Sequence, residues 1–315
     1  MEKSKNKSAC LARIGTVFLT GSTLFISLFC FASMAFSAPM EVFVSIPPQK
    51  WLSDKLGGTL VTTHVLVGKG QDPHTYEPTP RELIALSQAK LYFTLDLEFE
   101  GQIIPKLKKT VPTLHFVDTA GSIAKIGMTG HGHDEEAQSV SVPADKQEPH
   151  QEGLDPHVWL SPLNLKIMAA AMARAMMEKD PANKSSYEEN LLEVTRILER
   201  LHQGIKEELA PYQGASFYVF HPAFGYFAHT YHLQQEAIET GGKSPTPRQL
   251  ASLITQARAN KAQVIFVQPQ FDPKSAAALA NAIGGEVVPL DPLAEEVVAN
   301  LEIMARKVKA AFSAR

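Results

Sequence analysis

The sequence predicts an α/β protein with two related lobes, each a parallel sheet flanked by helices, joined by one long rigid helix. Short apolar runs rich in β-branched and aromatic residues alternate with helical patterns, as in parallel βαβ units. The order of loop histidine, capped helix and strand occurs twice in the 315 residues. A long amphipathic stretch without proline lies between the two occurrences. Together these observations favour two lobes over a single sheet.

The first 38 residues differ in composition from the rest of the chain. Three lysines and Arg13 precede residues 14–36, which carry no charge, and small residues follow. This is the pattern of a secretory signal peptide, so we expect export to the periplasm and a soluble mature protein. The two cysteines, Cys10 and Cys30, both lie in this segment. The exported protein would therefore contain no disulfide.

The expected first lobe covers residues 39–182. Thr79-Pro80-Arg81-Glu82 predicts a helix start with a capping box, and Ser161-Pro162 begins a second helix that runs to about residue 179. Four runs in this lobe read as buried strands, the last of them weaker: residues 41–46, 62–67, 91–95 and 113–117.

Residues 127–153 do not fit the pattern of a folded segment. They contain His131, His133 and His150 with six acidic residues, one lysine and no aromatic residue. Such a composition buries little apolar surface and predicts a mobile loop. Two interpretations stay open: a solvated charged loop, or an auxiliary segment that captures metal ions.

The linking helix is expected over residues 183–210 and the second lobe over residues 211–315. Apolar residues recur at helical spacing through the linker, which would span roughly 40 Å at 1.5 Å per residue. Thr246-Pro247-Arg248-Gln249 repeats the capping pattern of the first lobe. Three strands are expected in this lobe, at residues 216–220, 263–267 and 286–290.

Composition and motifs exclude several classes of function. The formal net charge is −3 with no basic block, so nucleic acid is not expected as a partner. The sequence has no H-E-x-x-H, G-x-S-x-G, P-loop or G-x-G-x-x-G motif, and without a mature cysteine there is no thiol chemistry. We therefore do not expect an enzyme.

Four residues stand where a ligand site is expected in a parallel α/β protein. His74 follows the second predicted strand by a short loop, and His221 and Asp291 directly follow strands. His157 precedes the helix that begins at Ser161. Three imidazoles and a carboxylate are ligands that Zn²⁺ accepts, although their long-range spacing is a weak signal by itself.

The remaining histidines have structural interpretations. We expect His64 and His115 to be hydrogen-bonded residues in or beside strands. His202, His229 and His232 are expected on helical stretches, as surface or satisfied core residues.

The motifs around these four residues resemble the cluster A-I solute-binding proteins of metal ABC importers. The resemblance rests on four segments that occur in the family's order along the mature chain: Gly70-Gln71-Asp72-Pro73-His74-Thr75-Tyr76-Glu77-Pro78, Asp155-Pro156-His157-Val158-Trp159-Leu160-Ser161-Pro162, Phe220-His221-Pro222-Ala223-Phe224-Gly225-Tyr226-Phe227 and Leu290-Asp291-Pro292-Leu293. In that family the metal lies in a cleft between two lobes joined by a long helix.

The resemblance implies that His74, His157, His221 and Asp291 are the metal ligands. A histidine at the third position, here His221, is similar to the zinc branch of the family, whereas manganese and iron members place a carboxylate there. Imidazole also suits Zn²⁺ by its ligand preference. Some zinc members carry a glutamate before the first histidine, but this chain has Pro73. The fourth ligand is therefore Asp291 or a water, and we favour Asp291.

The function implied is a periplasmic zinc receptor that delivers Zn²⁺ to the membrane permease of an ABC importer, with its cytoplasmic ATPase. The receptor is expected to be a monomer. One alternative is a manganese or iron receptor of the same family. Another is a zinc hydrolase with three histidine ligands, in which Glu77 or Asp72 would serve as the general base.

Overall fold

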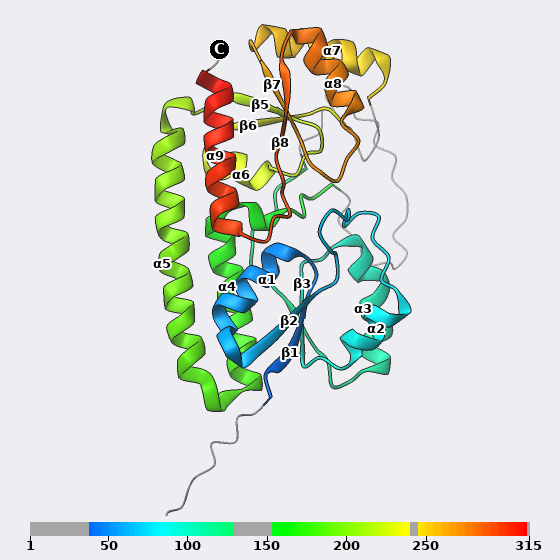
Figure 1. The fold of residues 1–315 in the computed structure, drawn as a ribbon, viewed down its shortest axis with the longest axis vertical. Coiled ribbons are helices and arrows are strands. Elements are labelled where there is room, and N and C mark those ends of the chain that lie inside the picture. Colours follow the sequence, from blue (N-terminus) through cyan, green and yellow to red (C-terminus); the bar gives the residue numbers. More distant parts are fainter. Residues whose placement is uncertain (1–37, 129–152, 240–244, 314–315) are drawn as a thin grey trace, which may run out of the picture. The chain divides into compact units, whose positions relative to one another are not determined.

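Two four-stranded parallel sheets form the framework of the protein. The computed structural model describes residues 38–128, 153–239 and 245–313 (Figure 1). The first sheet has the order β2-β1-β3-β4 and the second the order β6-β5-β7-β8, which is the same topology in chain order. The strands are β1 Met40–Val44, β2 Val61–Val65, β3 Leu91–Thr94, β4 His115–Asp118, β5 Ser216–Val219, β6 Gln234–Ala237, β7 Val264–Val267 and β8 Glu286–Pro289. The expectation of two related α/β lobes is confirmed.

All seven predicted strands are present, with ends that shift by one or two residues. The eighth strand, β6, was not predicted, because its sequence Gln-Gln-Glu-Ala has neither apolar alternation nor β-branched residues. This strand lies at the edge of its sheet and pairs only with β5 among the described strands. His232 precedes it in a turn with a φ of 57°, so the expectation that His232 is helical was wrong.

Helices flank both sheets, and two of them begin with the predicted capping boxes. The side chain of Thr79 accepts from the Glu82 backbone N–H, and that of Thr246 from Gln249. In return, Glu82 and Gln249 accept the backbone N–H of the capping threonine, at 2.7 and 2.8 Å. The helices are α1 Pro47–Gly57, α2 Pro80–Ser87, α3 Glu98–Thr110, α4 Pro162–Lys179, α5 Lys184–Leu209, α6 Gly225–Thr230, α7 Pro247–Ala259, α8 Lys274–Ile283 and α9 Val297–Ser313.

The helix α5 links the two lobes. It has 26 residues, packs against α1 and α4 of the first lobe, and lies beside α9 at the end of the chain (Figure 1). Its buried face includes Val194, Leu198 and Ile205. The main apolar core includes this face together with buried residues of both sheets. Because the lobes share this core, the structure opposes large independent movements of the lobes.

The lobes are also joined by hydrogen bonds close to α4. The indole Nε1 of Trp159 donates to the carbonyl of Pro292 at 2.7 Å, and Thr230 Oγ1 donates to Ser161 Oγ at 2.9 Å. Residues Ala38–Arg315 form one compact unit. The lobe boundaries at residues 182 and 211 accordingly remain a prediction.

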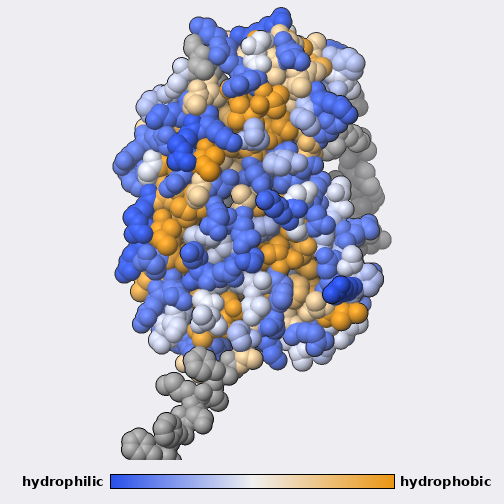
Figure 2. Space-filling model, in the orientation of Figure 1, coloured by the Kyte–Doolittle hydropathy of each residue, from blue (hydrophilic) through white to orange (hydrophobic). Residues whose placement is uncertain are grey.

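The surface drawn in Figure 2 is mixed in polarity. Apolar residues form separate groups divided by hydrophilic ones, with no single apolar area covering this face. Among the described helices, none combines the length and the apolar character that a bilayer span requires. The expectation of a monomer stays a prediction.

Candidate metal centre

Three histidines from distant parts of the chain meet beyond the carboxyl ends of the strands. His74 lies in the loop after β2, His157 immediately precedes the turn into α4, and His221 lies two residues after β5. One ring nitrogen of each lies within 4.8 Å of the others. His157 and His221 are buried, whereas His74 is half-buried. Within the described ranges, no other group of three or more His, Cys, Asp or Glu side chains is this compact.

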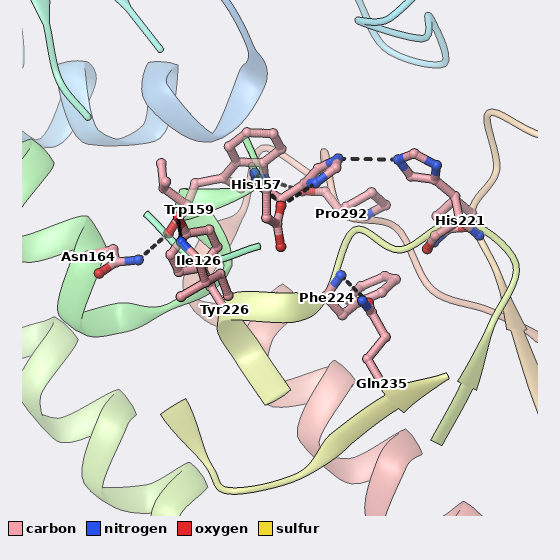
Figure 3. Close-up of polar contacts among 12 residues, drawn as sticks. Ile126, His157, Trp159, Asn164, His221, Phe224, Tyr226, Gln235 and Pro292 are labelled. Carbon is pink, nitrogen blue, oxygen red and sulfur yellow. Dashed lines mark hydrogen bonds and ion pairs between the residues drawn. The ribbon is translucent and has the colours of Figure 1, made fainter. Parts of the chain in front are cut away.

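The three rings lie close together. Their centroids are 5.0 Å apart for His74 and His221, 5.2 Å for His157 and His221, and 5.8 Å for His74 and His157. The Nε2 atoms of His157 and His221 are 3.4 Å apart (Figure 3). A tetrahedral Zn²⁺ with bonds of about 2.0–2.1 Å holds its ligand atoms at about this separation.

Two buried carboxylates determine which ring nitrogen carries the proton. Asp155 Oδ1 lies 2.8 Å from Nδ1 of His157, and Glu239 Oε1 lies 2.7 Å from Nδ1 of His221. A carboxylate only accepts, so each neutral ring places its proton on Nδ1 and its lone pair on Nε2. Two facing lone pairs cannot hydrogen-bond to each other. The 3.4 Å separation is therefore suited to a shared cation.

The loop that carries His74 is held by a different contact. Asp72 Oδ1 accepts the backbone N–H of His74 at 3.0 Å. Burial lowers the pKa of the His74 imidazole, and a charge on the neighbouring His221 lowers it further. The neutral ring, which is the form that binds a metal, is thus favoured at neutral pH.

Residues 42–311 match the sequence model of the family described as zinc-uptake complex component A periplasmic, ZnuA. The chain belongs to this family.

Individual proteins are similar to this chain over most of its length. The high-affinity zinc uptake system protein ZnuA of Yersinia pestis is 28% identical over 277 residues, covering 83% of this chain and 85% of that protein. The manganese ABC transporter substrate-binding lipoprotein PsaA of Streptococcus mitis is 27% identical over 278 residues, covering 84% of each. A crystal structure of a zinc-bound deletion mutant of ZnuA is 38% identical, with a TM-score of 0.77 over 87% of this chain and 98% of that one.

The structure does not bring every expected residue of the metal site together. Asp291 is absent from the compact group formed by His74, His157 and His221 among the described residues. Its Oδ1 accepts from the backbone N–H of Leu293 at 2.9 Å and from Gln270 Nε2 at 3.1 Å. The expected auxiliary residues His131, His133 and His150 lie outside the described residues.

Three residues of the centre were missed by sequence reasoning. Asp155 stands two residues before His157, as Asp72 does before His74, but no role was predicted for it from the sequence. Glu239 lies 18 residues after His221 and belongs to no motif. Gln268 is fully buried, accepts the His221 backbone N–H at 3.2 Å and donates to the His221 carbonyl at 2.6 Å. It therefore fixes the backbone of a candidate ligand, a contact that only the fold reveals.

Proposed function

We propose that this protein is a periplasmic receptor that binds Zn²⁺ through His74, His157 and His221 and delivers it to the permease of an ABC importer. A cytoplasmic ATPase would power the permease, and residues 1–38 would serve as the export signal. The observation that carries the proposal is the pair of Nε2 atoms 3.4 Å apart, each on a ring whose Nδ1 faces a buried carboxylate. Membership of the zinc-uptake family supports the same function.

The composition of the site favours zinc over manganese or iron. The compact group offers three imidazole nitrogens and no carboxylate oxygen among the described residues. Imidazole suits Zn²⁺, whereas Mn²⁺ prefers oxygen ligands. The carboxylates of Asp155 and Glu239 each contact the Nδ1 atom of a ring whose Nε2 would bind the metal. Their two negative charges balance a divalent cation, although neither carboxylate enters its coordination sphere.

The hydrolase alternative gains no support from the positions of its candidate bases. Glu77 is exposed and does not line the cavity beside the histidines. Asp72 lines that cavity, but its Oδ1 already accepts the His74 N–H. A general base must reach a water or substrate in the site, and neither carboxylate is arranged for that role.

Calorimetric titration of the metal-stripped protein with Zn²⁺ and with Mn²⁺ tests the proposal. We expect one zinc per protein, bound more tightly than manganese. His221→Ala should weaken zinc binding by more than ~100-fold, because losing a ligand costs more than losing its hydrogen-bond partner. His232→Ala is the matched control, because His232 lies in an exposed turn outside the site. Tighter manganese binding, or zinc binding unaffected by His221→Ala, would overturn the assignment.

A further inference from the structure

A buried glutamate in the first lobe holds the loop between β3 and α3. Glu100 is the third residue of α3, and only 1% of it is exposed. Its carboxylate accepts the backbone N–H of Leu95 and that of Leu97, each at 3.0 Å. The hydroxyl of Ser45, which follows β1, donates to the same carboxylate. Burying a charge is costly unless donors surround it, and here three donors converge on one group.

The hydroxyl groups beside Glu100 are arranged for an ionised carboxylate. Ser45 Oγ lies 2.9 Å from the hydroxyl oxygen of Tyr92. Because a carboxylate only accepts, Ser45 gives its one hydrogen to Glu100, and Tyr92 then donates to Ser45. A protonated Glu100 would present a hydrogen to neighbours that already donate, namely Ser45 and the backbone of Leu95 and Leu97. The surroundings of Glu100 therefore match the negative charge.

A second glutamate at the same helix position shows what capping alone requires. Glu82 is the third residue of α2 and accepts the backbone N–H of Thr79 at 2.7 Å, as Glu100 accepts that of Leu97. Glu82 is only partly buried, so a helix cap does not need the burial seen at Glu100. The burial of Glu100 instead accompanies its additional contacts beyond the cap, with the end of β3 and with the residue after β1.

The loop that Glu100 holds forms a wall of the candidate metal centre. Asp96 in the middle of the loop has a φ of 63°, which residues other than glycine rarely adopt. Successive N–H groups in such a turn form a concave site for an anion, here the carboxylate of Glu100. Leu97 lines the small cavity beside the three histidines. The charge of Glu98, the next residue, raises the pKa of His74.

We propose that Glu100 is a positioning residue of the metal centre, whose ionised carboxylate holds the β3–α3 loop, and through Leu97 the wall beside His74, in the zinc-binding conformation. Loss of the charge frees the backbone N–H groups of the loop and weakens zinc binding. Because coupling between two binding events is reciprocal, zinc binding in turn favours the ionised form. The inference rests on the proposed function, since it needs zinc at the three histidines.

The charge of Glu100 changes within an accessible range of pH. Burial raises the pKa of Glu100 to about 7, although hydrogen bonds from its neighbours oppose the shift. The other titratable groups of this region are Tyr92 on β3, Tyr76 in the loop after β2, and the exposed Asp96 and Glu98. Burial raises the pKa of both tyrosines, which therefore stay neutral. A pH titration thus changes the charge of Glu100 without changing theirs.

Zinc affinity as a function of pH tests the proposal. Glu100→Gln keeps the shape of the side chain and one acceptor oxygen but removes the charge. Competition with a chelator would give the Kd for zinc of both proteins at about pH 6, 7 and 8. The ratio of the two constants cancels the titration of the histidines, which both proteins share. Glu82→Gln is the matched control, because it makes the same change at the same position of α2, and Gln249 fills that position in α7.

We expect Glu100→Gln to bind zinc ~5-fold or more weakly than the wild type at about pH 8, because a charged hydrogen-bond acceptor is lost. The ratio should fall toward one at about pH 6, where the wild type has lost the same charge. Glu82→Gln should match the wild type throughout. Calorimetry in buffers of different ionisation enthalpy should show that the wild type releases more protons than Glu100→Gln on binding zinc at about pH 7.

A second variant tests the same coupling with the glutamate in place. Ser45→Ala removes a hydrogen bond that lowers the pKa of Glu100. The pKa of Glu100 should therefore rise, and zinc affinity should begin to fall at a higher pH than in the wild type. If Glu100→Gln does not fold, this shift decides the matter, and its absence would contradict the proposal.

Two further results would overturn the inference. A ratio of one at every pH would show that the charge of Glu100 does not act on the metal centre. A ratio above one that does not change with pH, together with a lower unfolding temperature, would show a purely structural role. If the wild type instead binds no zinc at any pH, the proposed function itself fails, and that outcome is distinguishable from the others.

Discussion

Two copies of one tripeptide, Asp-Pro-His, hold their histidines differently. In both copies the aspartate accepts the backbone N–H of its histidine, at 3.0 Å for Asp72 and 2.8 Å for Asp155. Only Asp155 also contacts the imidazole, with Oδ1 2.8 Å from Nδ1 of His157. The side chain of Asp155 is fully buried, whereas Asp72 is partly exposed. The same tripeptide therefore holds only the backbone of His74, an arrangement called the cap below. It holds both the backbone and the ring of His157, an arrangement called the clamp below.

The surroundings of the two copies explain the difference. Asp155 approaches α6 of the second lobe so closely that a Cβ on Gly225 would clash with its Oδ2. The segment after it is anchored by Trp159, which donates to Pro292. Among the described residues, the side chain of Asp72 forms hydrogen bonds only within its own loop, with His74 and Thr75. The comparison indicates that His157 is positioned before the metal arrives, as is His221 with Glu239, whereas His74 is held less firmly.

The largest effect of this difference is expected from matched substitutions of the two aspartates. Asp155→Asn keeps an acceptor oxygen but removes the charge that faces His157, and should weaken zinc binding by ~10–100-fold. Asp72→Asn should change zinc affinity by less than ~3-fold, because asparagine caps a backbone N–H as well as aspartate does. Competition with a chromophoric chelator measures both affinities.

The second lobe provides a check on the same comparison. Glu239→Gln should behave like Asp155→Asn, because Glu239 faces the ring of His221 in the corresponding way. Similar losses of zinc affinity in Asp72→Asn and Asp155→Asn would contradict the distinction between cap and clamp. Circular dichroism of the variants would show whether they remain folded.

The fold was largely predictable because each element carries a local signal. The strand runs were apolar and β-branched, and Thr79 and Thr246 marked helix starts through a capping box that needs only four residues. The edge strand β6 carried no such signal, since its residues are polar and its pairing with β5 is supplied by the sheet. The local sequence was thus sufficient to predict elements formed by residues near one another in the chain. It was insufficient for β6 at the edge of its sheet.

The candidate metal centre was predictable only in part. His74, His157 and His221 were identified from motifs, and the structure brings them together. Glu239 and Gln268 could not be identified, because their roles depend on distances across the fold and not on neighbours in the chain. Asp291 was expected as a ligand from the family resemblance and from its place after a strand, yet its Oδ1 accepts from Gln270 and Leu293. Strand-end position predicts proximity to a site but not the direction of a side chain.

Histidines without a carboxylate partner should make the metal-free protein sensitive to acid. Burial lowers the pKa of His202, and the charges of Lys206 and Lys166 lower it further. Its Nδ1 is buried with no hydrogen-bond partner among the described residues. Because the folded pKa lies below the unfolded value of about 6.5, the unfolded state binds more protons in acid. The contribution of the neutral His202 to the stability of the fold is therefore fully present above about pH 6.5. It is lost as the pH drops through the folded pKa.

Chemical denaturation of the metal-free protein at about pH 7.5 and about pH 5.5 measures this loss. His202→Gln should lose less stability between the two pH values than the wild type, because glutamine does not titrate. His232→Gln is the control, since His232 is exposed in its turn. An unchanged pH dependence in His202→Gln would show that other groups account for the acid sensitivity.

The smallest expected effect concerns movement of the lobes. The bond from Trp159 Nε1 to the Pro292 carbonyl is buried and joins the lobes beside His157. Trp159→Phe removes the donor and leaves that carbonyl unpaired, which should lower the free energy of unfolding by about 1–3 kcal/mol.

With the bond intact, small-angle scattering should give the same radius of gyration for the metal-free and zinc-loaded wild type. In Trp159→Phe a difference between the two states should become measurable. If the wild type already contracts clearly on binding zinc, the clamp on His157 forms with the metal rather than before it, and the distinction between the two Asp-Pro-His segments would hold only for the loaded protein.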